Sequence, residues 1–237
     1  MSQGLVKTTG TVSKRMVKWS YSSISLFQQC PKKYYHLRVA KDIKEKESEA
    51  LLYGSRVHTV AEEYVRDGKP IPKAFSYIKP AIDAVLASNE GEVHCELRLG
   101  LTENLKPCKF FAKDVWYRGV IDLLILDKKN KKAVIVDYKT GKNPKYADTK
   151  QLELMALAIF KHYEWVESIK AGLLFLVNPA LIKAEYLTSD QSSLWLKWIE
   201  KVNDLKGCTV NNVWNAVPNF TCRGWCPVVE CVHNGKS

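Results

Sequence analysis

The sequence predicts an α/β fold in which helices flank a mixed β-sheet. Residues 119–141 contain two arms rich in Val, Ile and Leu, joined by a lysine-rich turn around Asn130, which is typical of a hairpin whose strands are buried on both faces. Helical patterns lie on both sides of this hairpin, and two further apolar runs follow it. No internal repeat or interdomain linker is evident. We therefore expect a basic flexible arm over 1–18 and a single domain over 19–237.

Four helices and one strand are expected before the hairpin. Residues 19–35 carry hydroxyl caps and Pro31, which predict a helix pair with a proline break. Residues 50–65 repeat apolar residues at helical spacing, and this spacing places His58 on the inward face. A short helix over 80–87 leads to the first strand, which we expect to begin near Glu92.

Four elements are expected after the hairpin. Residues 150–162 are apolar nearly all round, which predicts a buried helix. The runs 171–177 and 183–187 predict two strands. Ser189 and Asp190 are expected to cap a last helix that ends near Leu205, with its tryptophans in the core.

Composition indicates a polyanionic partner. The 237 residues include 36 Lys and Arg against 25 Asp and Glu, a formal net charge of +11, and nucleic acid leads the candidates over ordinary solubility. No apolar run reaches bilayer or signal-peptide length, so we expect an intracellular protein without a membrane partner. Seven cysteines without a secretion signal favour thiols or metal ligands over disulfides.

The hairpin carries the residues with the clearest chemistry. In a short-turn register Asp122 and Asp137 fall opposite or diagonal to each other, and such a carboxylate pair needs a cation between them. A divalent metal fits, with the Tyr138 carbonyl as a further oxygen ligand. Lys139 shares a face with Asp137 and can orient water or stabilise negative charge, so the arrangement predicts metal-assisted phosphodiester hydrolysis. The alternative is a structural hairpin whose aspartates pair with lysines.

These motifs resemble a known nuclease family. Gly119-x-x-Asp122, Asp137-Tyr-Lys-Thr-Gly141 and Gln151-Leu-Glu-Leu are similar to the core of the PD-(D/E)xK nuclease superfamily, in its RecB-like branch. The resemblance implies a restriction-endonuclease-like sheet, Mg²⁺ or Mn²⁺, and DNA as substrate.

The same resemblance suggests roles for three more residues. Gly54-x-x-x-His58 resembles the first motif of this branch, where the imidazole is a metal ligand, although a histidine on an apolar face is also often only a core residue. Glu96 lies where relatives often have an acid, with a solvated face as the alternative. Gln151 would hold the active-site lysine or the substrate, or only cap its helix. Met155 stands where relatives have tyrosine.

The C-terminal region packs three cysteines into ten residues, at Cys222, Cys226 and Cys231. Three thiolates on a Gly/Pro-rich loop can surround one face of a metal centre, and Cys30 is the leading fourth ligand. This pattern resembles AddB-type nucleases and the CRISPR-associated spacer-trimming nuclease, where a [4Fe-4S] cluster ties the two ends of the domain together. Zn²⁺ held by the three cysteines with Cys30 or His233 is the alternative.

The resulting expectation is an Mg²⁺- or Mn²⁺-dependent DNA exonuclease acting on free or single-stranded ends. A structure-specific endonuclease and a catalytically idle nucleic-acid-binding module are the alternatives. The resemblance further implies recombination, repair or replication in a prokaryotic or phage-infected cell, with a helicase or recombination protein as partner.

Overall fold

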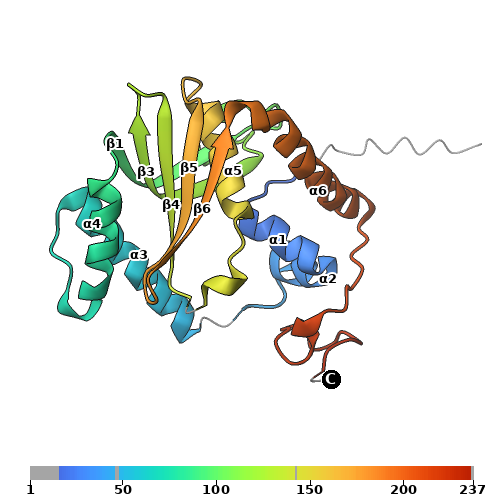
Figure 1. The fold of residues 1–237 in the computed structure, drawn as a ribbon. Coiled ribbons are helices and arrows are strands. Elements are labelled where there is room, and N and C mark those ends of the chain that lie inside the picture. The colour runs from blue at the N-terminus through green and yellow to red at the C-terminus, as the bar shows by residue number, and fades with distance from the viewer. Residues whose placement is uncertain (1–15, 46–47, 142, 236–237) are drawn as a thin grey trace, which may run out of the picture.

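The computed structural model describes residues 16–45, 48–141 and 143–235, and these segments form a sheet covered by helices on both faces (Figure 1). Most of the basic arm expected at 1–18 lies outside the described residues. In the described part of the chain, no helix has both the length and the apolar character that crossing a membrane would require.

The sheet has six strands in the order β2-β1-β3-β4-β5-β6. The strands are β1 (Glu92–Leu101), β2 (Pro107–Cys108), β3 (Tyr117–Asp127), β4 (Lys132–Lys139), β5 (Ser168–Phe175) and β6 (Ala180–Leu187). Neighbours are antiparallel except for β4 and β5, which are parallel and are joined through a crossover helix. The predicted mixed sheet with flanking helices is confirmed.

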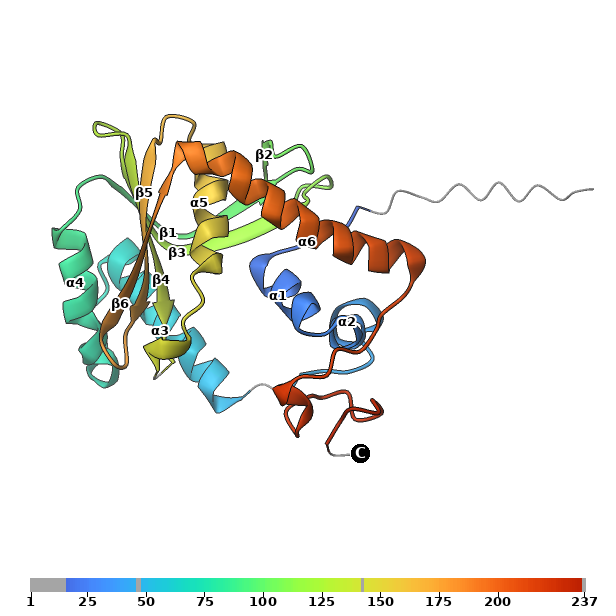
Figure 2. The ribbon, with the colours of Figure 1, turned by 45° about the vertical axis from the view of Figure 1, so that its right-hand side comes forward.

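Helices of two groups cover the two faces of the sheet. The helices are α1 (Tyr21–Gln29), α2 (Pro31–Tyr34), a π-helical turn (Tyr35–Ala40), α3 (Glu49–Asp67), a 3₁₀ segment (Lys73–Ile78), α4 (Lys79–Ala87), α5 (Lys150–His162) and α6 (Gln191–Asn211), with short 3₁₀ turns at Pro144–Tyr146, Thr188–Asp190 and Phe220–Cys222. Side chains of α1, α5 and α6 form the larger core on one face, and those of α3 and α4 form the smaller core on the other. Figure 2 shows these groups on opposite sides of the sheet.

The ends of several elements differ from the prediction. The strands expected at 171–177 and 183–187 are β5 and β6, which both begin three residues earlier, because the ladder between them runs without a break from Ser168↔Leu187 to Phe175↔Ala180. Asp190 occupies the N-cap position of α6, as predicted, but its side chain makes no capping hydrogen bond to this helix. Residues 188–190 form a 3₁₀ turn, and the Asp190 carboxylate accepts the Leu187 N–H at 2.8 Å. Trp195 and Trp198 are buried in the core, as expected.

Strands β1 and β3, which pair with each other, both reverse the faces of their side chains at one level. Cys95 on β1 and Leu123 on β3 pack on the α3/α4 side, whereas Leu97 and Ile121, two residues further along each strand, pack on the α5 side. Glu96 lies at the reversal with φ +50°, a value that is uncommon for a residue with a side chain. Beyond this level β1 and β3 curve away under α6 (Figure 2).

Candidate active site

The two hairpin acids lie where β3 and β4 begin to separate. The paired register ends at Leu123↔Val136, and one further step in the same register sets Asp122 opposite Asp137. Beyond that pair, the Asp122 Oδ2 atom accepts the Tyr138 backbone N–H at 2.7 Å in place of a strand carbonyl. A carboxylate thus occupies the gap between the two strands.

Asp122 also belongs to a group of three ligand atoms from three elements. The ligand atoms of His58 on α3, Glu96 on β1 and Asp122 on β3 all lie within 4.8 Å of one another, and His58 Nδ1 is 3.3 Å from Asp122 Oδ2. Two carboxylates and an imidazole are suitable ligands for a divalent cation. Glu96, for which the sequence left a solvated position open, is half-buried and faces this group.

Asp137 is held by a separate set of contacts. Lys139 Nζ lies 2.5 Å from Asp137 Oδ2 and donates its hydrogen bond to Gln151 Oε1 at 3.0 Å. The Gln151 amide donates to Asp137 Oδ1 at 2.8 Å. Asp137 is not one of the three grouped ligand residues, and among the described residues its Oδ2 is paired with the Lys139 ammonium. Gln151, at the start of α5, ties the acid and the lysine together.

The pKa shifts of these groups show that negative charge is crowded here. Burial and the Asp122 charge raise the pKa of Asp137 to about 6, although Lys139 and His58 act in the opposite direction. Burial, Asp122 and Glu62 raise the pKa of Glu96. Burial opposes charge on His58, but the hydrogen bond and charge of Asp122 outweigh it and raise the pKa of that imidazole. A bound cation would offset this repulsion, so the residues fit a divalent metal.

The backbone near Asp122 provides one more oxygen. The Lys139 carbonyl accepts the Leu176 N–H next to β5. Because alternate residues of a strand direct their backbone groups to opposite neighbours, the Tyr138 carbonyl is directed toward β3 and the gap. The Tyr138 ring itself is buried under α3.

Close approach of α3 to the end of β4 depends on a glycine. A Cβ atom at Gly54 would lie 3.0 Å from Thr140 Oγ1, closer than nearly all natural contacts. Gly54 precedes His58 by one helical turn, so a side chain at residue 54 would crowd Thr140 next to the turn of α3 that carries the imidazole.

One pair of polar residues near the site was missed by sequence reasoning. Tyr21 on α1 donates its hydroxyl to Asp148 Oδ2 at 2.7 Å and so ties α1 to the loop before α5. Burial, the Asp148 contact and the charge of Asp137 raise the pKa of Tyr21. The partners are 127 residues apart, and no local pattern marks either of them.

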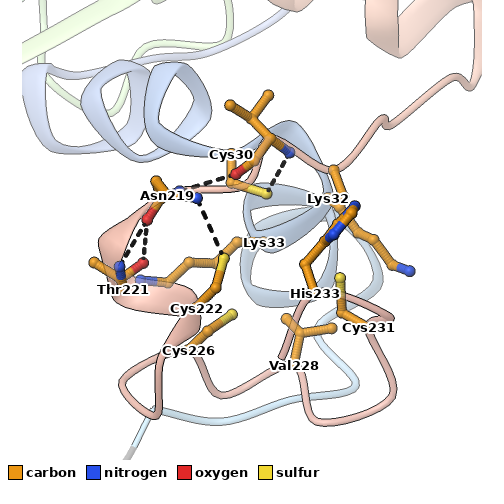
Figure 3. A pocket seen from close by; sticks show the side chains of 12 residues that line it. Cys30, Lys32, Lys33, Asn219, Thr221, Cys222, Cys226, Val228, Cys231 and His233 are labelled. Carbon is orange, nitrogen blue, oxygen red and sulfur yellow. Dashed lines mark hydrogen bonds between the residues drawn. The ribbon is translucent and has the colours of Figure 1, made fainter. Parts of the chain in front are cut away.

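The four predicted cluster cysteines line one pocket. Cys30 follows α1, and Cys222, Cys226 and Cys231 come from the C-terminal loop that packs beneath α2 (Figure 3). The Val217 and Asn219 N–H groups donate to Cys30 Sγ and Cys222 Sγ, each at 3.5 Å.

Further contacts close this pocket and bear on what it can hold. Lys32, Lys33 and His233 also line it, and Asn234 donates to the Cys226 and Val228 carbonyls. No three of the thiol and imidazole ligand atoms lie within 4.8 Å of one another, whereas tetrahedral Zn²⁺ would set thiolates about 3.8 Å apart. The pocket gathers ligand types that suit a metal centre.

Two solved structures resemble this chain. The crystal structure of SSO0001 aligns at 13% identity with a TM-score of 0.48, covering 92% of this chain and 87% of that one. A protein from Eubacterium rectale named "Putative exonuclease" aligns at 12% identity with a TM-score of 0.49, covering 98% and 92%. No curated protein matches the sequence significantly.

A protein-family model matches nearly the whole domain. It spans residues 18–231 and so includes the hairpin acids, Lys139, His58 and all four cysteines of the pocket. The match extends over far more than half of the chain. This protein therefore belongs to the PD-(D/E)XK nuclease superfamily.

Proposed function

We propose that this nuclease is an Mg²⁺- or Mn²⁺-dependent DNA exonuclease of the RecB-like branch. One observation carries the proposal: Glu96 and Asp122 lie beside His58, and the most buried acid, Asp137, lies next to Lys139 on the adjacent strand. Such a set of carboxylates is costly without a cation, because burial and mutual repulsion both oppose their charge.

Each residue takes a role that its contacts support. His58, Glu96, Asp122, Asp137 and the Tyr138 carbonyl would hold the metal, which when bound lowers the pKa of water and offsets charge on the scissile phosphate. Lys139 stabilises the negative charge that develops on the phosphate, since its ammonium is half-exposed at the site. Gln151 is a positioning residue that holds Lys139 and Asp137 at fixed distance.

The cysteine pocket is proposed to hold a [4Fe-4S] cluster that links the two ends of the domain. Four thiols, two amide donors to sulfur and two nearby lysines suit an anionic cluster. Zinc held by the same cysteines is the alternative.

A DNA digestion assay tests the nuclease. Wild type with Mn²⁺ should degrade end-labelled linear DNA, and Lys139→Ala should be slower by about 100-fold or more, the usual effect of removing one electrostatic stabiliser. Lys170→Ala is the matched control, since this exposed lysine of β5 lies on the α4 side of the sheet. If wild type and Lys139→Ala leave the DNA equally intact, the chain is a catalytically idle binding module.

The same assay separates exonuclease from endonuclease. A covalently closed circular single strand should stay intact while a linear strand of equal length is lost, because an exonuclease needs an end. Opening of the circle at a comparable rate would identify an endonuclease. Since unwound ends arise from strand separation, we also propose a helicase or recombination protein as partner, in recombination, repair or replication.

A further inference from the structure

A groove of mixed polar and apolar lining adjoins the active site. It has a volume of about 730 Å³ and lies between α1 and the first residues of β3. Gln151 forms part of its wall, so the groove opens beside the lysine and the acids. Its lining residues are Ser20, Tyr21, Ser22, Ser25, Leu26, Gln29, Phe110, Tyr117, Arg118, Gly119, Val120, Gln151 and Met155. Among these described residues none is acidic.

Arg118 is the cation of this groove. Its guanidinium carbon lies 5.2 Å and 5.4 Å from the ring centroids of Phe110 and Phe111. Arg38 and Arg66 pair with acids, but among the described residues no carboxylate pairs with Arg118. Its Nε atom is buried without a hydrogen-bond partner. A positioned guanidinium without a protein anion is well suited to binding an external phosphate.

The opposite wall offers neutral hydrogen-bonding groups. Ser22, Ser25 and Gln29 are spaced three and four residues apart and so share one face of α1. Hydroxyl and amide groups of this kind commonly contact nucleic-acid phosphates and sugars without reading sequence. The walls thus combine donors on one side with a cation and aromatic rings on the other.

We infer that this groove binds a single DNA strand on its way to the active site, with Arg118 contacting a phosphate. Phe111, which does not line the groove but contacts its residues Arg118 and Phe110, stacks on a base. Phe111 is 72% exposed, and stacking on an exposed ring requires a base face that a duplex keeps covered. The inference rests on the proposed nuclease function, whose substrate it narrows to single-stranded DNA bound without sequence preference.

An acid placed in the groove tests the inference without weakening the fold. Ser22→Glu puts a carboxylate in the first turn of α1, where negative charge favours the helix, so thermal stability should hold. Gln28→Glu is the matched control, because Gln28 is an exposed residue of α1 outside the groove lining. Both substitutions are introduced into the Lys139→Ala variant. Binding to a labelled oligo-dT is then measured by fluorescence anisotropy without divalent metal. We expect Ser22→Glu to weaken binding about tenfold or more and Gln28→Glu less than twofold.

Two further variants test the wall that carries Arg118 and the aromatic rings. Arg118→Ala should weaken binding and flatten the plot of log affinity against log salt by about 0.7, the contribution of one single-strand phosphate. Phe111→Ala should weaken binding about fivefold or more through lost stacking. Lys170→Ala, which removes a charge on the other side of the sheet, should change affinity less than twofold.

The outcomes separate the two proposals. Equal binding by Ser22→Glu and Gln28→Glu, with an unchanged salt slope in Arg118→Ala, would overturn the groove even if wild type digests DNA. Weakened binding in these variants would support the groove even if wild type fails to digest DNA. A duplex that competes as well as a single strand of equal length would overturn the single-strand assignment.

Discussion

Asp137→Asn is expected to lower nuclease activity about 1,000-fold while raising the stability of the metal-free protein. The loss follows because a metal-facing carboxylate contributes several kcal/mol to catalysis. The gain follows because burial and Asp122 raise the pKa of Asp137 to about 6, so its charged form is unfavourable in the fold. Compared with the ordinary value of 3.8, this difference corresponds to at most about 3 kcal/mol.

The raised pKa of Asp137 determines how the stability of the protein depends on pH. A carboxyl group with a raised folded pKa holds its proton more tightly in the folded state, so stability falls as pH rises from about 4 to about 6. The stability difference between Asp137→Asn and wild type should therefore be small near pH 4 and reach its full size by pH 7. Thermal unfolding in the presence of a chelator, over this pH range, measures it.

Asp127→Asn is the matched control on the same hairpin. Hydrogen bonds from Asn130 lower the pKa of Asp127, the half-buried last residue of β3, so removing its charge should slightly reduce stability. Activity should remain, because Asp127 lies at the far end of β3 from the site. Retained activity in Asp137→Asn, or lower stability of that variant at pH 7, would contradict the role proposed for Asp137.

Cys30→Ser is expected to lose most bound iron and to destabilise the domain by about 4 kcal/mol. Cys30 and Cys231 line one pocket although they lie near opposite ends of the domain, so a shared cluster would close a very long loop. Cross-links over loops of this size contribute about that much through the unfolded state. Anaerobic purification, the visible absorption spectrum, metal analysis and thermal unfolding measure both effects.

Two other cysteines serve as controls for this variant. Cys95 lies on β1 and Cys208 on α6, and neither lines the cysteine pocket. Cys95→Ser and Cys208→Ser should keep the iron content and the colour of wild type. If the protein is colourless and contains stoichiometric zinc, the pocket is a zinc site and not a cluster site. If the metal content of Cys30→Ser is unchanged, Cys30 is not a ligand.

Predictions from local sequence agree with the structure where a short turn, or the period of a strand or helix, determines the direction of a side chain. The apolar arms and the turn at Asn130 define the hairpin, because a short connection leaves few registers. The two-residue spacing of Asp137 and Lys139 places both on one face of β4, and the helical period turns His58 toward the sheet.

Other features depend on contacts between distant segments. The sequence left Glu96 between a site acid and a solvated residue, because its positive φ and the face reversal of β1 and β3 do not appear in any local pattern. Its placement beside His58 follows from that reversal. The cation–π contacts of Arg118 with Phe110 and Phe111 also depend on tertiary structure, because the loop that carries the two rings folds back on β3.

By itself the sequence determined the hairpin, the spacing of its acids and lysine, and the inward face of the histidine helix, since hydrogen-bond geometry repeats every two or 3.6 residues. Only the tertiary structure decided that β3 and β4 part at Asp122, that Glu96 turns toward His58, and that Asp137 is bound by Lys139 and Gln151. The physical reason is that strand curvature and burial are set by packing over the whole chain, and these set the distance between charges.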